Sequence, residues 1–279
     1  MTRIIQITDT HIVRPGTLAY GVVDTAAALQ EAVATITRLL PMIGPIDAVI
    51  VSGDLTDFGD PEEYRRFRSI MSGLTLPLAV VPGNHDRREP LRSAFADLPT
   101  MPASGPVNWR LEFPDLRVIG LDTLVDGFPH GELAPETLVW LAETLAQAPD
   151  VPALVAMHHP PFPTGIVHMD RQNLRNGEAL FAAISNHRAP LTLAFGHVHR
   201  TIMSSHRGTP MIIAPSPAHA VALDHRPDGP PDLMREPGGF LLHHTSGDGV
   251  RGEGIRGGIV SESVPVGRFP GPYPFFPES

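Results

Sequence analysis

The stretch Ile4-Ile5-Gln6-Ile7-Thr8-Asp9-Thr10-His11 is an apolar run that ends abruptly in acidic and imidazole side chains. A short apolar run of this kind predicts a buried strand, and open α/β sheets carry their sites at the carboxyl ends of such strands. Four further runs end in the same way, in the motifs Gly53-Asp54, Gly83-Asn84-His85-Asp86, His158-His159 and Gly196-His197-Val198-His199. The sequence therefore predicts a sheet whose loops meet at one polar site.

Strand-like and helix-like segments alternate over the first two thirds of the chain. Apolar runs predict strands at 4–8, 48–51, 78–81, 117–121, 153–157 and 191–195. Asp24 caps a predicted helix that Pro41 ends, Asp60 and Pro61 open a second, and apolar spacing indicates two more near 135–145 and 178–187. This βαβα order favours an α/β sandwich.

The chain changes character after Pro217. Residues 225–238 are rich in proline and 247–258 in glycine, which predicts two or three β-hairpins and long loops, a large part of them outside the core. The aromatic, proline-rich end at 269–276 is interpreted as a disordered tail, a clamp over the site or a strap across a subunit interface. We therefore divide the chain into a catalytic domain, 1–220, and a C-terminal extension of strands and loops, 221–279, that serves as a lid or an oligomer contact.

Composition narrows the range of partners. The formal charge is −9 with only 21 Lys and Arg residues, so no basic stripe is present for the backbone of a long nucleic acid. The absence of cysteine excludes disulfides, thiolate ligands and a cysteine nucleophile. The N-terminal apolar run is too short for a signal peptide, and no apolar stretch approaches the ~18 residues of a membrane span. We expect a cytoplasmic protein without membrane contact that forms a homo-oligomer, a dimer or larger.

The polar motifs carry the donors that transition metals use. Carboxylates, imidazoles and one amide oxygen suit Mn, Fe, Co or Zn, and a shared carboxylate holds two ions about 3.5–4 Å apart, as a two-metal hydrolase requires. Because strand side chains alternate, Asp9 can converge with His11 and His197 with His199. A single such histidine is more often a core or capping residue, but so many imidazoles and carboxylates together need a cation to neutralise them. The expected ligands of two divalent ions are Asp9, His11, Asp54, Asn84, His158, His197 and His199.

The motif order D-x-H, G-D, G-N-H-D, H-H and G-H-x-H resembles that of the calcineurin-like metallophosphoesterases, over residues 1–220. Within this family the chain looks most similar to class III cyclic-nucleotide phosphodiesterases and bacterial glycerophosphodiesterases, through residues 18–24 and 158–162. The resemblance implies a four-layer αββα sandwich with a C-terminal β and loop extension, and a site between its two sheets. It also implies one metal bound by Asp9, His11 and His199, another bound by Asn84, His158 and His197, and Asp54 as the bridge.

The same resemblance leaves His85 as the histidine beside the phosphate that binds no metal. A phosphodiester is anionic and resists hydroxide, so a metal-bound hydroxide would attack phosphorus directly while His85 stabilises charge or protonates the leaving oxygen. Asp54 is expected to be catalytic as the bridging ligand. The expected substrate contacts are Asn84, His85, His219 and Tyr20.

Two carboxylates and one further histidine are expected to support the site. Asp57 and Asp86 can each accept the free N–H of a histidine, and Asp86 stands where many relatives have Glu, so it can orient His85. His159 can line the pocket or hold its loop by a backbone hydrogen bond. We therefore expect a layer of hydrogen bonds behind the metal ligands.

The predicted function is a dinuclear, metal-dependent phosphodiesterase that acts on small phosphodiesters such as cyclic nucleotides or glycerophosphodiesters. The alternatives are a phosphomonoesterase or a nuclease on the same scaffold, and a non-catalytic metal-binding scaffold protein. The scaffold hypothesis is disfavoured because such proteins usually lose ligands or the free histidine, and this chain keeps all of them.

Overall fold

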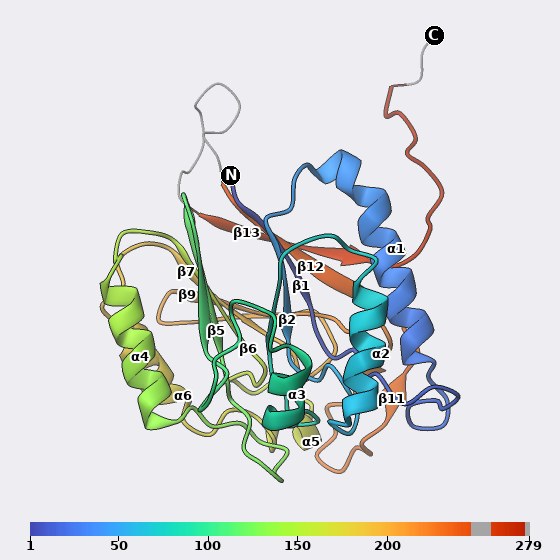
Figure 1. The fold of residues 1–279 in the computed structure, drawn as a ribbon, viewed down its shortest axis with the longest axis horizontal. Helices are drawn as coiled ribbons and strands as arrows, with labels where there is room; N and C mark the ends of the chain where they lie inside the picture. The colour runs from blue at the N-terminus through green and yellow to red at the C-terminus, as the bar shows by residue number, and fades with distance from the viewer. Residues whose placement is uncertain (247–257, 277–279) are drawn as a thin grey trace.

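Two sheets stack between two layers of helices in the computed structural model, which describes residues 1–246 and 258–276 (Figure 1). The first sheet has the order β13-β12-β1-β2-β3 and the second the order β4-β5-β6-β7-β9-β8. The first is built from β1 (Arg3–Ile7), β2 (Ala48–Ser52), β3 (Leu78–Val81), β12 (Gly239–Thr245) and β13 (Ile259–Pro265). The second is built from β4 (Trp109–Phe113), β5 (Leu116–Leu121), β6 (Ala153–Met157), β7 (Leu191–Phe195), β8 (Ile202–His206) and β9 (Thr209–Ile213). The predicted four-layer αββα sandwich is confirmed.

The helices cover the outer faces of the two sheets. On one side lie α1 (Thr25–Ile43), α2 (Pro61–Met71) and α3 (Arg88–Ala94), and on the other α4 (Pro135–Ala146) and α6 (Gly177–Ile184), with the short α5 (Val167–Asp170) near the strand ends (Figure 1). Strand alternation produces these layers, because Leu154 faces the other sheet while Val155 packs with the α4 and α6 core. In the described part of the chain, no helix is both long and apolar enough to cross a bilayer.

A buried polar side chain ties the two sheets together beneath the strand ends. Gln6 of β1 donates from Nε2 to Ser52 Oγ at 2.7 Å and to the Phe195 carbonyl of β7 at 3.0 Å. Its Oε1 accepts from His243 Nε2 of β12 at 2.9 Å. Because a buried amide is costly unless it is fully hydrogen-bonded, these contacts fix β1 against both neighbours and against the second sheet.

Most predicted elements are present, and Pro41 is an exception. Asp60 and Glu63 form the capping box of α2, with the Glu62 N–H at 2.8 Å from the Asp60 carboxylate. The prediction that Pro41 ends the first helix is wrong, because α1 continues to Ile43. Proline keeps a helical φ, and the hydrogen bond that it removes lies in the last turn, so only Met42 and Ile43 follow it in the helix.

The described residues after Pro217 form two antiparallel pairs, β12 with β13 and β10 (Ala220–Val221) with β11 (Leu233–Met234). Much of this region is exposed, as expected, but β12 belongs to the core, because it pairs with β1 and buries Phe240 and Leu241 completely. An uncovered apolar edge would be a template for pairing with other chains, and β12 covers this edge of β1. The division of the chain at residue 220 stays a prediction, and most of the glycine-rich stretch lies outside the described residues.

The aromatic segment leaves the fold beside α1. The Gly267 N–H donates to Thr35 Oγ1 at 3.0 Å, and the Arg38 guanidinium donates to the Gly267 carbonyl. Beyond this anchor Phe275 and Phe276 are 97% and 91% exposed. The segment runs away from the strand ends that carry the polar motifs, so within one chain it does not cover them (Figure 1).

Candidate metal centre

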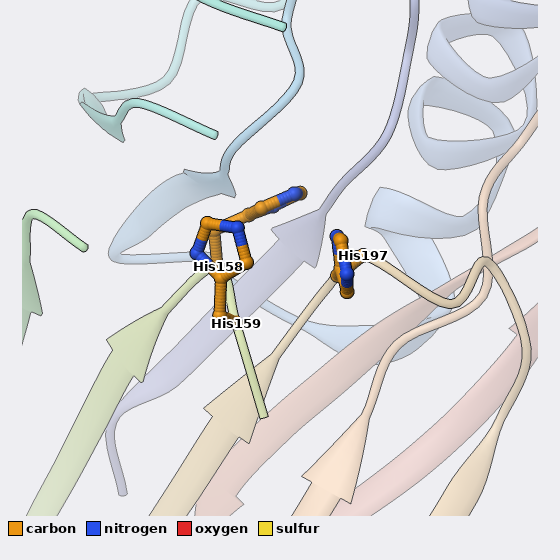
Figure 2. Close-up of side chains that lie close together, drawn as sticks. All are labelled: His158, His159 and His197. Carbon is orange, nitrogen blue, oxygen red and sulfur yellow. The ribbon is translucent and has the colours of Figure 1, made fainter. Parts of the chain in front are cut away.

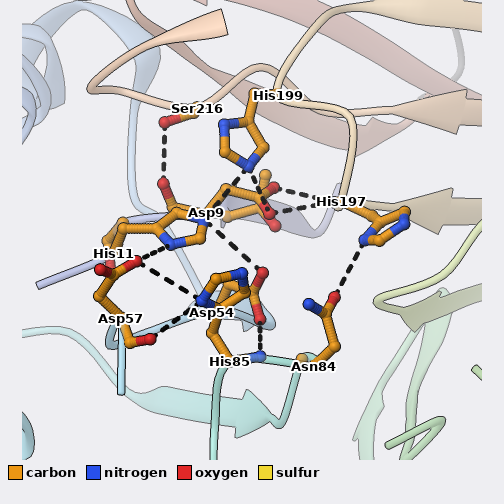
Figure 3. A network of polar contacts seen from close by, with 12 residues as sticks. Asp9, His11, Asp54, Asp57, Asn84, His85, His197, His199 and Ser216 are labelled. Atoms are coloured by element: carbon orange, nitrogen blue, oxygen red, sulfur yellow. Dashed lines mark hydrogen bonds and ion pairs between the residues drawn. The ribbon is translucent and has the colours of Figure 1, made fainter. Parts of the chain in front are cut away.

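The polar motifs follow strands of both sheets and meet between them (Figure 3). Asp9 follows β1, Asp54 follows β2 and Asn84 follows β3, all in the first sheet. His158 follows β6 and His197 follows β7, both in the second. The carboxylates and these two histidines are at most 2% exposed. The fold therefore buries a group of charged and imidazole side chains at a single place.

One set of donors comes from Asp9, His11, His199 and Asp54. His199 Nε2 lies 3.3 Å from Asp9 Oδ1 and 3.2 Å from His11 Nε2. His11 Nε2 lies 3.6 Å from Asp54 Oδ2. Ligand bonds of about 2.1 Å separate neighbouring donors of one ion by roughly 3.0–3.5 Å, so the spacing of Asp9, His11 and His199 is close to that of the donors of one cation, and Asp54 lies beside them.

A second set comes from Asp54, Asn84, His158 and His197. His158 Nε2 lies 3.2 Å from Asp54 Oδ2 and 3.2 Å from Asn84 Oδ1. His197 Nδ1 lies 3.0 Å from the same Asn84 oxygen. These neighbouring distances are close to those between donors of one cation, and Asp54 Oδ2 lies next to donors of both sets. All seven residues expected to bind metals are thus brought together, with Asp54 between the two groups.

His159 also lies close to this cluster, as Figure 2 shows beside His158 and His197, and the three rings could by distance hold an ion. However, Thr123 Oγ1 at 2.8 Å and the Pro129 carbonyl at 3.2 Å occupy both of its ring nitrogens. These bonds leave it no free donor. We therefore assign His159 to holding its loop, which was one of its two predicted roles.

Hydrogen bonds behind the cluster orient the imidazoles. His158 Nδ1 donates to the Ser52 carbonyl at 2.9 Å, which turns Nε2 toward Asp54. Asp57 Oδ1 lies 2.9 Å from His11 Nδ1, as predicted for that carboxylate (Figure 3). Partners of this kind fix the tautomer and direction of a metal-binding histidine.

The prediction that Asp86 orients His85 is wrong. The Asp86 carboxylate accepts from the Gly83 N–H at 2.9 Å and the Leu55 N–H at 3.2 Å, and so braces the loops after β2 and β3; it also accepts from the Tyr64 hydroxyl of α2 at 2.9 Å. His85 Nδ1 donates instead to the Asp57 carbonyl at 2.9 Å. The motif spacing alone could not separate these roles, because Asp86 turns inward where its loop bends.

Left-handed backbone, rather than strand alternation, brings the ligands together. Asp9, His11, Asp54, His197 and His199 have φ values between 41° and 74°. Such a conformation costs a residue with a Cβ about 1–2 kcal/mol, so the surrounding fold must hold each one. Asp9 and His11 lie beyond the end of β1, and the alternation expected from the sequence does not apply to them.

The glycines of two motifs permit the close approach of these loops. A Cβ on Gly83 would lie 2.2 Å from Asp54 Oδ1. On Gly196 it would lie 2.0 Å from Thr8 Oγ1 and 2.7 Å from Asp9 Oδ2. Side chains at these positions would displace the carboxylates, which explains why glycine precedes Asn84 and His197.

Charge coupling keeps the candidate ligand carboxylates Asp9 and Asp54 ionised, whereas burial raises the pKa of Asp86 to about 6. Burial alone would raise the pKa of Asp54, but the neighbouring His158 and His85 outweigh it and hold this pKa well below its ordinary value. Burial would lower the pKa of His158, whereas Asp54 raises it to about 9. For His85, Asp54 and the Asp57 carbonyl outweigh burial and raise the pKa above its ordinary value. The carboxylates are therefore available to bind cations at neutral pH.

A cavity of about 280 Å³ opens over the cluster, and both Tyr20 and His219 line it. The His219 ring lies 4.5 Å from that of His199, and the Tyr20 hydroxyl lies 3.5 Å from His11 Nδ1. Burial, with the nearby His199, lowers the pKa of His219 to about 2, so this ring is neutral. His168 and Gln172 also line the cavity, and no motif in the sequence pointed to them.

Two donor sets that share one carboxylate, placed between the sheets of an αββα sandwich, define the class of dinuclear metal-dependent phosphoesterases. The family model for calcineurin-like phosphoesterases matches residues 2–201, and the chain belongs to this family, whose members use two divalent metal ions. It is 37% identical over 276 residues to a probable glycerophosphodiester phosphodiesterase, GpdQ, of Arcobacter nitrofigilis, covering 99% of this chain and 97% of that protein.

Two further comparisons agree with this assignment. The chain is 39% identical over 257 residues to a probable cyclic nucleotide phosphodiesterase of Rhodopseudomonas palustris, covering 88% of this chain and 92% of the relative. The crystal structure of a dimetal phosphatase from Danio rerio superposes with a TM-score of 0.59 at 14% identity, covering 95% of this chain and 99% of that one. At this identity the second likeness shows the fold alone.

We predict that Asp54→Ala loses both metals and that Asn84→Ala loses chiefly one. Asp54 supplies an oxygen to both donor sets, whereas the neutral amide of Asn84 belongs to one. Since partners behind the ligands alone change affinity about 10–100-fold, loss of the bridge should weaken metal binding by more than about 100-fold. Metal content per chain after dialysis checks this, with Asp150→Ala, an exposed carboxylate paired to Arg188, as the control. Equal losses from the first two variants would contradict the assignment.

Proposed function

We propose that the protein is a dinuclear, metal-dependent phosphodiesterase that hydrolyses small phosphodiesters. The observation that carries the proposal is the position of Asp54 Oδ2, 3.6 Å from His11 Nε2 and 3.2 Å from His158 Nε2, where it belongs to both donor sets. The names of two relatives, a probable glycerophosphodiester phosphodiesterase and a probable cyclic nucleotide phosphodiesterase, support a diester substrate. Cyclic nucleotides and glycerophosphodiesters are the proposed substrate classes.

The residues of the two donor sets fit hard and borderline divalent ions. Asp9, His11 and His199 would hold one ion, Asn84, His158 and His197 the other, and Asp54 both. We propose Mn, Fe, Co or Zn, because carboxylate, imidazole and amide donors without thiolate suit these ions. When bound, two such ions lower the pKa of water and neutralise phosphate oxygens.

The remaining polar residues would handle the substrate. His85 lies beside the cluster with Nδ1 bonded to the Asp57 carbonyl, so its Nε2 is the free end of the ring. It is placed to stabilise charge on the phosphate or to give a proton to the leaving oxygen. Asn84 would contact both metal and substrate, while His219 and Tyr20 would line the pocket on the other side.

Two alternatives use the same scaffold. A phosphomonoesterase or nuclease would use the same donor sets, but the net charge of −9 disfavours long nucleic acids. A non-catalytic metal-binding scaffold is disfavoured by the complete set of buried donors and by the half-buried, orientable His85.

A rate comparison tests the proposal. The protein, stripped of metal and reloaded with Mn, should hydrolyse bis(p-nitrophenyl) phosphate faster than p-nitrophenyl phosphate, and the stripped protein should hydrolyse neither. Faster turnover of the monoester would favour the phosphatase alternative. Turnover of neither substrate, at full metal content, would favour the scaffold.

We predict that the His85→Ala variant keeps both metals and loses activity. The loss should be larger for diesters whose leaving group is more basic. A positioned acid contributes about 10²–10⁴-fold, and a nitrophenolate needs no proton to depart. The loss of kcat/KM should therefore be larger for alkyl diesters than for aryl diesters. Equal losses on both would remove the general-acid role and leave only electrostatic stabilisation.

We also propose that the protein is a cytoplasmic homo-oligomer and that residues 268–276 form a strap between subunits. Phe269, Tyr273, Phe275 and Phe276 are all more than half exposed in one chain. Aromatic surface of this kind is stabilised when another subunit covers it. A chain that ends at Gly267 should keep both metals and sediment as a smaller species than the full chain. An unchanged sedimentation coefficient would contradict the strap.

A further inference from the structure

A second, larger cavity meets the first at the metal cluster. It has a volume of about 740 Å³ and shares Asn84 and His85 with the smaller one. Phe58 and Phe128, which are 63% and 55% exposed, line it together with Arg87 and Arg88. A phosphodiester has two arms on one phosphorus, and two cavities that meet at His85 offer each arm its own space.

The acidic side chains around the second cavity already have partners. Asp126 accepts from Arg88 at 3.2 Å, and Arg88 also holds Asp122 at 2.7 Å. Glu89 lies 3.4 Å from Arg92, and Asp57 and Asp86 are engaged with His11 and Tyr64. Hydrogen-bonded and paired carboxylates repel an incoming anion less than free ones do.

Arg87 differs from its neighbour Arg88. It is exposed, and within the described residues it forms no ion pair. Its backbone N–H donates to the Tyr64 hydroxyl at 3.1 Å, and its stem lies so close to Gly59 that a Cβ there would be 2.5 Å from Arg87 Cγ. The backbone and stem are thus held, while the guanidinium remains available to a ligand in the cavity.

We propose that the second cavity receives the leaving alcohol of the diester and that Arg87 selects alcohols carrying an anionic group, such as a carboxylate or a further phosphate. The inference rests on the proposed phosphodiesterase function. A guanidinium without an internal partner is suited to a carboxylate or phosphate, which it can bind through two N–H groups.

The position of His85 assigns the leaving arm to this cavity. His85 Nδ1 donates to the carbonyl of Asp57, and both Asp57 and Phe58 line the second cavity but not the first. The Nδ1 edge of the ring is therefore anchored at the wall of the larger space, while the ring itself lines both cavities. A group that protonates a leaving oxygen must lie within hydrogen-bond reach of it. His219 and Tyr20 line only the first cavity and would face the retained arm.

Three chromogenic diesters test the inference with the Mn-loaded protein. Methyl 4-nitrophenyl phosphate is the reference, methyl 3-carboxy-4-nitrophenyl phosphate carries a carboxylate on the leaving group, and 3-carboxypropyl 4-nitrophenyl phosphate carries one on the retained arm. The measured quantity is the selectivity ratio, kcat/KM for a charged diester divided by kcat/KM for the reference. Because the ratio compares two substrates on the same enzyme sample, a general loss of folded or metal-loaded enzyme does not change it.

We predict that Arg87→Gln lowers the selectivity ratio for the charged leaving group about two- to fivefold, as expected for one solvent-accessible charge pair. Arg87→Glu should lower it further, because repulsion replaces attraction. Arg65→Gln is the matched control, since Arg65 is an exposed arginine of α2 outside both cavities, and it should leave the ratio unchanged.

Each of the other outcomes would overturn one part of the proposal. An unchanged ratio in both Arg87 variants would overturn the selection by Arg87. A ratio that falls only for the charged retained arm would overturn the assignment of the leaving arm to the second cavity. Failure of the metal-loaded wild type to hydrolyse any of the three diesters would overturn the proposed function itself, a result distinct from active enzymes with equal ratios.

Discussion

The buried carboxylate of Asp54 is the group on which the rest of the site depends. It is 2% exposed, accepts the His85 N–H at 2.8 Å and lies between His11 of one donor set and His158 of the other. An ionised carboxylate in such a place is costly unless cations and hydrogen bonds compensate it. The bridging position between two donor sets and the histidines from both sheets supply this compensation, and the glycine at 83 leaves room for it. The strands of both sheets must therefore end at the same edge, where these groups can meet.

The strands, and the residues that meet in the buried cluster, could be predicted from the sequence because both depend on local patterns. Residues 153–157 and 191–195 are strands with the predicted bounds, and each run of polar residues after a strand does reach the cluster. The motifs carry this information through residue type and order. The family resemblance added the partition into two metal sites, which no spacing in a single chain could supply.

The features that could not be predicted from the sequence depend on contacts between segments that are far apart along the chain. The inward turn of Asp86, the left-handed backbone at Asp9 and His197, and the bonds that occupy His159 all arise from loops that meet only in the folded protein. Strand alternation led to the correct prediction that these ligands converge. The reason was wrong, however, because the ligands lie beyond the ends of the strands. Likewise β12 could not be placed from composition, because its short apolar run resembles any surface hairpin until β1 is known to need a neighbour.

The pairing of β1 with β12 sets an order of events during synthesis. Arg3 lies opposite His244 and Gln6 opposite Leu241, so the strand that precedes Asp9 and His11 acquires one of its two neighbours only near the end of translation. A ribosome makes the amino end first, and an open apolar edge is a template for association with other chains. A nascent or prematurely terminated chain that stops before residue 239 therefore holds every candidate metal ligand and still exposes one side of β1. Completion of the chain, rather than of the ligand set, closes the sheet that carries the centre.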